Sequence, residues 1–421
     1  MKPQLLDEWK NLRDTLDYIE HSETPPSRAN IAEHLSLSRT TASSLAAQLI
    51  ATGIIEELDS EVNGRGRPGI PLHISVRHWY ALGAAFSGNE WMFLIVDLKG
   101  NIIKEHTEKV TSFAVETFTK SLLRGLSYMI KRKPGPLLPL IGIGTPGLVD
   151  SNIGLIISAD DMEWRQVALG ESVLKHTGIP AMIMNRHRTS GLAEARFGAS
   201  RNIKNLIYIG VGTGISAALI NDGVLLEGIS FSAGEIGHTL IDPQGPLCGC
   251  GKRGCLQAMA SSQALVQIAR ELHQSLATAN RSFQSPSIPL APNPLWEILH
   301  DNSLISGELI GVEANNGNAV AIDCMQKIAE VLGVVVGNLI NIMNPQKIII
   351  GGTLGNTGPL LTRLISQEAV KHAMSTPMAA VAIEQGLLGN RASALGAACL
   401  PLQYKLELLL KRELHKEEFS V

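Results

Sequence analysis

Residues 234–255, GEIGHTLIDPQGPLCGCGKRGC, bring one imidazole and three thiols into a short segment rich in glycine. His238, Cys248, Cys250 and Cys255 match in number and kind the ligands of a tetrahedral zinc site. The intervening glycines let the backbone wrap around an ion. Because the protein fills all four positions and leaves none for water, the sequence predicts a structural Zn2+ site. The alternative is a group of buried free thiols beside an unrelated histidine.

The composition is that of a multidomain α/β protein. The chain has 421 residues, 45% of them apolar and 18% charged, which is enough for several domains with sizeable cores. Its apolar runs are interrupted before they reach membrane-spanning length, and its first residues contain no secretory signal. Five cysteines are too few for a disulfide scaffold. We therefore expect a soluble, cytoplasmic protein without a membrane partner.

Residues 1–75 differ in pattern from the rest of the chain. They predict helices over 4–20, 28–35 and 39–52, followed by two short strands at 54–58 and 72–74. Ser27 and Ser38 are suited to capping the second and third helices, and Gly53 to ending the third. This order of elements predicts a winged helix-turn-helix domain, in which one helix enters the major groove of DNA.

The presumed DNA face combines small hydroxyl side chains with arginines. Such side chains contact base edges and phosphates, and a glycine-flanked arginine fits a narrow minor groove. The net charge of the whole chain is −3, so DNA binding requires a local basic patch of this kind. The alternative is a small helical interaction domain, since residues 1–75 carry seven Lys/Arg against eleven Asp/Glu. The predicted DNA-binding residues are Arg28, Ser38, Arg39, Thr40, Thr41, Ser43, Ser44, Arg65 and Arg67.

Residues 76–421 alternate apolar strands with amphipathic helices, an α/β pattern that occurs twice and predicts two similar lobes. Residues 276–297, rich in Ser and Pro, predict an irregular excursion, and residues 404–419 a charged amphipathic helix. The predicted strands are 80–86, 91–96, 139–143, 181–184, 206–210, 215–220 and 347–351. The predicted helices include 114–130, 189–197, 261–275 and 318–342.

Several segments resemble the ROK family of repressors and sugar kinases over nearly the whole chain. The most specific are Glu235-Ile-Gly-His238 and the cysteine motif, and the winged N-terminus with GRGRPG is similar to that of the family's repressors. The resemblance implies an actin-like, hexokinase-type two-lobed domain over residues 76–421, with sugar bound between the lobes. Further matching segments are 142–147, 192–198, 212–214, 344–345 and 351–352.

The resemblance also implies a sugar-binding set. The family's sugar ligands fall on Asn185, Arg186, Glu235, His238 and Gln257 of this chain. One imidazole nitrogen of His238 can bind zinc while the other faces a sugar hydroxyl, so that the metal orients a binding residue.

Two departures from the kinase pattern argue against an enzyme. Arg186 stands where the kinases have the carboxylate base, and arginine is always protonated at neutral pH. The first phosphate loop lacks its acid over residues 83–89. Arg186 and the uncharged Gln257 together favour an anionic effector. The alternatives are a neutral sugar, or a degenerate pocket in which Arg186 pairs with Glu235 or Asp150.

We therefore expect a sugar-responsive, DNA-binding transcriptional regulator, most simply a repressor released by a sugar or sugar phosphate. Its predicted partners are operator DNA, the effector and a second copy of the chain, as a homodimer or a dimer of dimers. Two rival hypotheses remain open at this point: a ROK sugar kinase that uses ATP, and a regulator controlled by a protein partner.

Overall fold

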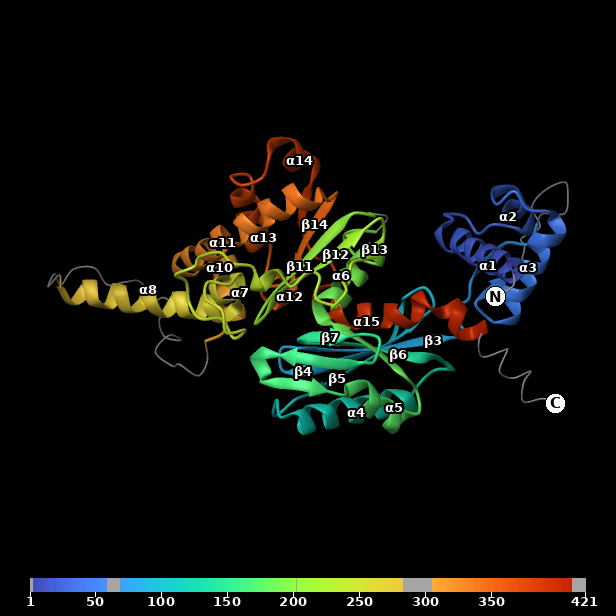
Figure 1. Ribbon diagram of the computed structural model, residues 1–421, viewed down its shortest axis with the longest axis horizontal. Helices are drawn as coiled ribbons and strands as arrows, with labels where there is room; N and C mark the ends of the chain where they lie inside the picture. Colours follow the sequence, from blue (N-terminus) through green and yellow to red (C-terminus); the bar gives the residue numbers. More distant parts are fainter. Residues whose placement is uncertain (1–2, 59–68, 202, 283–304, 411–421) are drawn as a thin grey trace.

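The computed structural model describes residues 3–58, 69–201, 203–282 and 305–410 of the chain. An N-terminal module, blue in Figure 1, lies at one end of the molecule beside two larger lobes. The red helix α15 (Ala392–Gln403) runs between the lobes and reaches toward this module. No helix in the described ranges has the length and apolar character needed to cross a membrane.

The N-terminal module is the predicted winged helix-turn-helix. Its elements are α1 (Pro3–His21), α2 (Arg28–His34), α3 (Arg39–Ala51), β1 (Ile55–Glu57) and β2 (Leu72–Ile74). The two strands pair antiparallel. The Ser27 and Ser38 side chains accept hydrogen bonds from the backbone N–H groups of Asn30 and Thr41, which caps α2 and α3 as expected.

The first lobe is built on a five-stranded sheet in the order β10-β6-β3-β4-β5. Side chains alternate between its two faces, so that Leu82 and Phe86 lie in the cluster with α4 while Ala81 and Ala85 lie in the cluster with α15. The elements of this lobe are β3 (Tyr80–Ser87), β4 (Glu90–Asp97), β5 (Ile102–Lys109), α4 (Val115–Lys131), β6 (Leu137–Thr145), β7 (Leu148–Asp150), β8 (Leu155–Ala159), η1 (Asp160–Met162), β9 (Trp164–Val167), α5 (Leu169–Thr177) and β10 (Ala181–Asn185).

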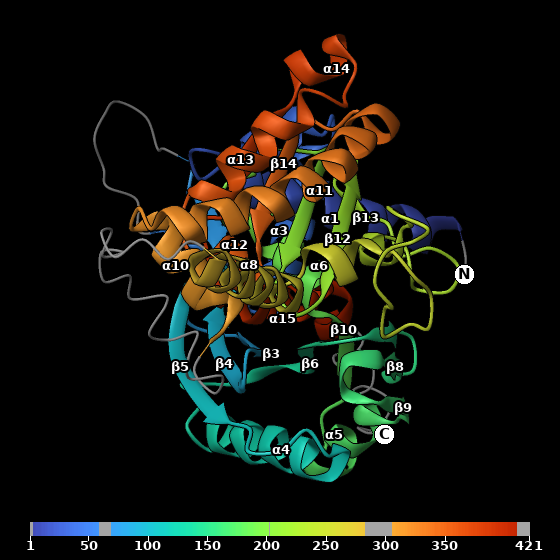
Figure 2. The same cartoon turned by 90° about the vertical axis from the view of Figure 1, so that its left-hand side faces the viewer.

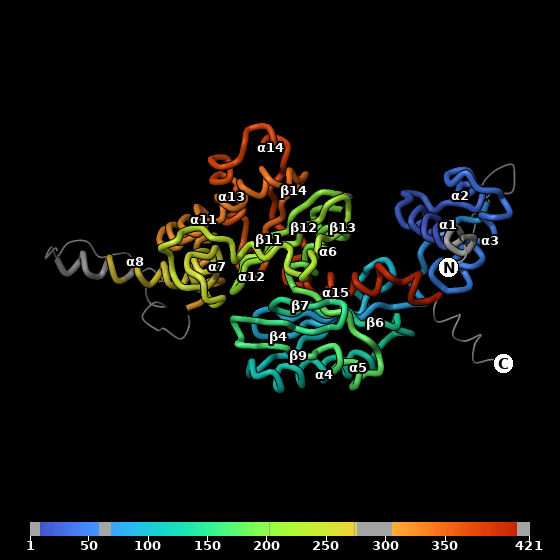
Figure 3. The backbone as a smooth tube through the Cα atoms, viewed as in Figure 1, coloured from blue at the N-terminus to red at the C-terminus, as the bar shows by residue number. Residues whose placement is uncertain are grey.

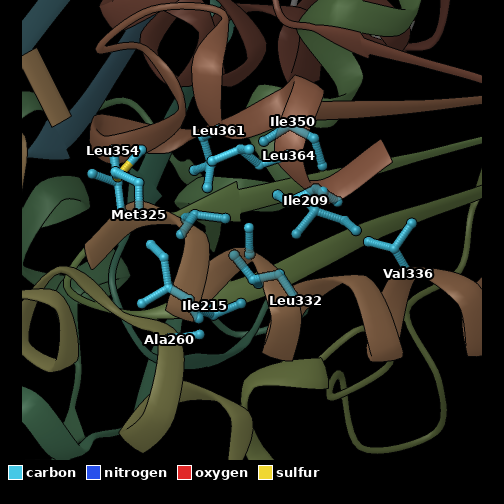
Figure 4. Packing of buried hydrophobic residues seen from close by; sticks show 14 of the residues in the cluster. Ile209, Ile215, Ala260, Met325, Leu332, Val336, Ile350, Leu354, Leu361 and Leu364 are labelled. Carbon is cyan, nitrogen blue, oxygen red and sulfur yellow. The ribbon is translucent and has the colours of Figure 1, made fainter. Parts of the chain in front are cut away.

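The second lobe repeats this topology in the order β13-β12-β11-β14-β15. In each lobe three strands form an antiparallel meander, and two further strands join in parallel. Figure 4 shows the apolar core between this sheet and α11, where Ile209 and Ile350 lie near Leu332 and Val336. The elements are β11 (Leu206–Val211), β12 (Ile215–Asn221), β13 (Val224–Leu225), η2 (Ile236–His238), α7 (Leu256–Ala260), α8 (Ser262–Ser282), α10 (Gly307–Asn315), α11 (Ala319–Met343), β14 (Lys347–Gly351), α12 (Gly352–Gly355), α13 (Leu360–Ala369), α14 (Ser375–Ala380), β15 (Ala382–Gln385) and η3 (Gly389–Arg391).

Two helices cross between the lobes. The helix α6 (Arg186–Arg196) follows the last strand of the first sheet but contacts β11 and β12 of the second. Conversely, α15 follows the second sheet and packs on β3 and β6 of the first. Figures 2 and 3 show both helices in the layer between the two sheets. Any change in the angle between the lobes must therefore act on α6 and α15.

One sequence expectation needs correction. Residues 276–282, expected to be irregular, continue α8, since the first proline of that region is Pro286 and nothing before it breaks the helix. The remainder of the excursion, 283–304, lies outside the described residues. The C-terminal helix expected at 404–419 is present at 405–410, directly after a turn at Tyr404, and its remainder lies outside the described residues.

Candidate functional site

His238, Cys248, Cys250 and Cys255 converge on one point. Their ligand atoms all lie within 4.8 Å of one another. The Sγ atoms of Cys250 and Cys255 are 3.7 Å apart, as are Cys248 Sγ and His238 Nδ1. Four ligands placed tetrahedrally at zinc–sulfur distances of about 2.3 Å would be about 3.8 Å apart. The quartet therefore has the chemistry and spacing to hold a metal ion, and the unrelated-histidine alternative is wrong.

The loop that carries the cysteines is folded by its own backbone. Cys248 donates its N–H to the Lys252 carbonyl, and Gly251 returns its N–H to the Cys248 carbonyl. Gly251 has a φ of +84°, which a side chain rarely tolerates. A Cβ on Gly254 would lie 1.5 Å from the Asp242 carbonyl oxygen. This stretch consequently needs glycine at both positions to bring the thiols together.

Asn185 ends β10 and caps α6. Its Oδ1 accepts the His187 backbone N–H and the Ser216 hydroxyl, and its Nδ2 donates to the Gly147 carbonyl. The residue is buried and its side chain is already well bonded. Its role in the structure is to fix the start of α6 beside the cleft.

Glu235 lies immediately before η2 and is largely buried. Its Oε1 has no hydrogen-bond partner among the described residues. Burial raises the pKa of Glu235 to about 7, against the opposing attraction of Arg188. Arg188 is held in place by donating to the Ala233 carbonyl. A buried carboxylate with an unmet acceptor is suited to receive a ligand hydroxyl.

Arg186 does not form the ion pair that the degenerate-pocket alternative required. Its Nη2 donates to the Thr213 hydroxyl at 3.1 Å, and no carboxylate in the described ranges makes a salt bridge with it. Glu235 instead lies near Arg188, and Asp150 accepts the backbone N–H of Asn152. Burial lowers the pKa of Arg186, but a guanidinium stays charged at neutral pH.

Gln257, at the start of α7, reaches toward an acid that sequence reasoning did not select. Its Nε2 donates to Asp161 Oδ1 at 3.2 Å, and its Oε1 accepts the Ile215 N–H at 3.1 Å. Burial raises the pKa of Asp161, and the charge of Arg186 opposes this. The sequence suggested that this region lacks a negative charge, because Gln257 stands where the family has a glutamate. Asp161, bonded to Gln257, supplies a carboxylate there.

A pocket open to solvent lies at the meeting of the two lobes, and Arg186 lines it. His187 lines it, and the buried Nε2 of this residue has no hydrogen-bond partner among the described residues. Burial lowers the pKa of His187 to about 3, so the ring is neutral. Other lining groups are hydroxyls, amides and glycine backbone from Ser87, Ser190, Tyr208, Gly212, Gly352, Thr353, Asn356, Gly389, Asn390 and Ser393.

The presumed DNA face is exposed on α3. Five of its predicted residues are exposed, and Thr41 is half-buried. Arg28 is paired with Glu57 at 2.7 Å, so part of its charge is compensated within the module. Arg65 and Arg67 lie outside the described residues. The five exposed residues are Ser38, Arg39, Thr40, Ser43 and Ser44.

Two residues that interact with predicted site residues were not selected from the sequence: Asp161, bonded to Gln257, and Arg188, whose charge acts on Glu235. Asp161 belongs to an acidic run that precedes Trp164, a segment for which both a cleft and a core position were open. Trp164 turns out to be a core residue, since it is 3% exposed and donates its indole N–H to the Phe113 carbonyl. The acidic run itself was the available signal for Asp161.

Comparison with known proteins identifies the family. The ROK family model matches residues 82–404. The chain is 28% identical over 397 residues to the DNA-binding transcriptional repressor Mlc of Escherichia coli, covering 92% of each chain. It is 26% identical over 388 residues to the xylose repressor of Bacillus spizizenii, covering 92% of this chain and 93% of that one.

Among solved structures, a ROK family transcriptional regulator described as a homolog of E. coli Mlc superposes with a TM-score of 0.78 at 26% identity. The match covers 96% of this chain and 99% of that one, and so extends over the winged module as well as the two lobes. With a family model matching most of its length, the chain belongs to the ROK family.

Proposed function

We propose that this protein is a sugar-responsive, DNA-binding transcriptional repressor that works in the cytoplasm. The observation that carries the proposal is the joining, in one chain, of an exposed polar face on α3 and an interlobe cleft with unmet hydrogen-bonding groups. The repressor names of its relatives support the same function.

On this proposal α3 is the recognition helix. Ser38 and Thr40 are bonded to each other through their hydroxyls, and the neighbouring Arg39 is exposed at the helix start. Arg65 and Arg67 are proposed to reach the minor groove from the wing. A homodimer would place two such helices on half-sites about 34–36 Å apart, or a multiple of that distance.

The proposed effector is a sugar or sugar phosphate held between the lobes. Glu235 offers a buried acceptor to a hydroxyl. Asn185 and Gln257 bond to neighbouring residues of β12, and His238 ends the short helix that Glu235 precedes. We propose that these side chains hold the same ligand. The guanidinium of Arg186 donates to the Thr213 hydroxyl and makes no ion pair in the described part of the chain, which leaves donors for an anionic group. The carboxylate of Asp161, which interacts with the charge of Arg186, would repel an anionic ligand, so a neutral sugar is the competing candidate.

We propose that the quartet at 238–255 binds a structural Zn2+ ion. The ion would draw His238 and the three thiolates together, leaving no protein position open for a reacting water. Nδ1 of His238 is the nitrogen nearest the thiols, so Nε2 is the one that would face the ligand. The metal would thereby fix the orientation of a sugar-binding side chain.

We propose further that the protein has no kinase activity. The residue at the position of the kinase base is Arg186, which cannot accept the proton of a sugar hydroxyl. The carboxylate of Asp161 interacts with the charge of Arg186, but its Oδ1 already accepts a hydrogen bond from Gln257. Turnover of ATP dependent on an added sugar would overturn this part of the proposal.

The function can be tested with DNA ligands selected from a random duplex library on the zinc-loaded protein. Arg39→Ala should weaken binding of the selected duplex about tenfold or more, the cost of one lost DNA contact. The exposed Arg363 of α13 is far along the chain from the winged module, and Arg363→Ala is the matched control. Selection of no preferred sequence, or equal loss in the two variants, would contradict a sequence-specific regulator.

The effector can be tested by thermal shift with glucose, N-acetylglucosamine and their 6-phosphates. A ligand at 100 times its Kd stabilises the protein by about 2.7 kcal/mol. We expect the strongest stabilisation from a phosphorylated sugar, and its loss in Arg186→Gln. Stabilisation by neutral sugars alone would overturn the anion proposal. Stabilisation by none, together with a partner captured without sugar, would favour control by a protein.

A further inference from the structure

Glu20, near the end of α1, holds two cations that come from two different parts of the ROK domain. Its Oε1 is paired with Arg196, the last residue of α6. Its Oε2 accepts a hydrogen bond from Lys405 Nζ at 2.7 Å, just beyond α15. The side chains of Glu20 and Lys405 are only 19% and 6% exposed. One carboxylate of the DNA-binding module thus joins α6 and the segment that directly follows α15.

The charges in this cluster are present at neutral pH. Burial alone would raise the pKa of Glu20, but Lys405 and Arg196 outweigh it and hold the pKa below its ordinary value. Removing the carboxylate would leave two partly buried cations without their shared partner. Such paired charges are directional, unlike apolar contacts, and therefore specify how two bodies are oriented.

The cluster lies within an apolar joint. Leu12, Leu16 and Ile19 of α1 belong to the same buried cluster as Leu402 and Leu406. Apolar burial of this kind stabilises the contact in proportion to the buried area, but it is not directional and does not fix the orientation of α1. The ion pairs of Glu20 with Arg196 and Lys405 add this directional constraint.

The other end of α6 faces the cleft. Asn185 and Arg186 start this helix, and its eleven residues span about 16 Å. Its middle is fixed to α15, since the hydroxyls of Thr189 and Ser393 are 3.0 Å apart and a Cβ on Gly396 would lie 1.6 Å from the Thr189 carbonyl oxygen. Packing this close lets α6 and α15 move only together, as a single rigid pair.

We propose that Glu20 is the positioning residue through which the cleft controls the DNA-binding module: its paired grip on Arg196 and Lys405 makes α1 follow the α6–α15 pair. A ligand that shifts the start of α6 then reorients α1, and with it the recognition helix. This inference rests on the proposed function, because it names the route by which that regulator is controlled.

A neighbouring pair provides the matched control. Arg13 of α1 is paired with Glu407, and so joins α1 to the same C-terminal segment as Glu20 does. Within the described ranges, Arg13 makes no ion pair with α6. The Arg13 side chain is 61% exposed. Arg13→Gln should therefore remove an ion pair between the same two segments without breaking the route from the cleft.

The experiment measures, in full-length protein, the Kd for a library-selected duplex with and without the sugar that stabilises the wild type most among glucose, N-acetylglucosamine and their 6-phosphates. The ratio of the two values is the coupling factor, typically about 5–150-fold in allosteric proteins. We expect it to fall to within twofold of unity in Glu20→Gln, while the Kd for sugar without DNA changes less than twofold. Arg13→Gln should keep the wild-type factor.

Arg196→Gln and Arg196→Lys keep the proposal falsifiable if Glu20→Gln fails to fold. Arg196→Gln should abolish the coupling between sugar and DNA binding. Arg196→Lys keeps the charge, so it should retain at least half of the wild-type coupling free energy. A wild-type coupling factor in Glu20→Gln or Arg196→Gln, or an equal loss in Arg13→Gln, would overturn the proposal.

Hydrogen exchange separates failure of this inference from failure of the proposed function. If no sugar alters DNA binding by the wild type, sugar control fails by itself, and the joint is tested without ligand. Glu20→Gln should then speed exchange at least tenfold in both residues 15–21 and residues 190–196, whereas Arg13→Gln should leave 190–196 unchanged. If hydrogen exchange in Glu20→Gln were faster in α1 alone and unchanged in residues 190–196, the proposed connection between α1 and α6 would be wrong.

Discussion

The two ends of α6 each carry an arginine, and the two arginines have opposite surroundings. Arg186 donates to one hydroxyl and makes no ion pair in the described ranges, while Arg196 is paired with the carboxylate of Glu20. A charge held away from water is stable when paired and costly when it is not. On our proposals, the paired end serves as a joint between domains, and the end with unmet donors receives the ligand. The predictions below test this contrast, beginning with the largest expected effect.

Loss of the metal ion from the His238, Cys248, Cys250 and Cys255 quartet should have the largest consequence. Structural zinc contributes on the order of 10 kcal/mol to folding in small zinc peptides. We expect Cys250→Ser to lose stoichiometric metal and to melt at a clearly lower temperature, as seen by metal analysis and thermal unfolding. Cys324→Ala, at a buried cysteine of α11, is the control that keeps its metal. Equimolar zinc in Cys250→Ser would show that the quartet is not the site.

The paired end should respond to charge and to pH. Glu20→Gln should lower the free energy of unfolding at pH 7 by about 1.5–3 kcal/mol, the value of a hydrogen bond to a charged group. Because Lys405 and Arg196 depress the native pKa of Glu20 despite its burial, this stabilisation is complete above the ordinary value of 4.5. It is lost as the pH falls through the lower native pKa.

Urea unfolding of the wild type and Glu20→Gln at matched pH values checks this sign. The difference between them should be constant from pH 7 to about 5 and should shrink below that. A difference that grows on acidification would contradict the ion cluster.

The close packing that joins the two ends should be sensitive to a single methyl group. Overpacking a dense contact costs about 1–3 kcal/mol, so Gly396→Ala should destabilise the protein by that amount. It should also reduce the coupling of sugar to DNA. Gly355→Ala is the matched control, because a Cβ there meets its neighbours at ordinary distances of 3.4–3.6 Å. Equal stability of the two variants in thermal melts would argue against a rigid α6–α15 pair.

The smallest effect should follow from the exposed pair between Arg13 and Glu407. Exposed ion pairs contribute less than about 1 kcal/mol. Arg13→Gln should therefore change the free energy of unfolding, measured in urea, by less than that amount, and the change should vanish at high salt. If Arg13→Gln lowered the free energy of unfolding as much as Glu20→Gln, burial would not be what makes the Glu20 pairs stronger than the exposed pair.

The features predicted well from the sequence are those made within short segments. The metal quartet lies within residues 238–255, and each helix of the winged module has its own cap, at Ser27 and Ser38. The two-lobed fold followed from alternating apolar patterns. Local spacing was sufficient in each of these cases.

The features missed are contacts between distant segments. Gln257 and Asp161 are 96 residues apart, Arg196 and Glu20 are 176 apart, and Lys405 and Glu20 are 385 apart. No periodicity within one segment encodes such a meeting, because each partner reads as an ordinary exposed charge on its own helix or loop. The charge interaction of Glu235 with Arg188 rather than Arg186 was missed for the same reason, since neighbouring residues of a helix point in different directions.

The most direct test of a ligand end coupled to a DNA end is one reciprocal titration. Binding of the strongest sugar of the panel is measured by calorimetry with the zinc-loaded protein alone and with the protein saturated by its selected duplex. We predict that DNA weakens sugar binding by the same factor by which the sugar weakens DNA binding. A sugar that binds the cleft with one affinity in both states would contradict the account.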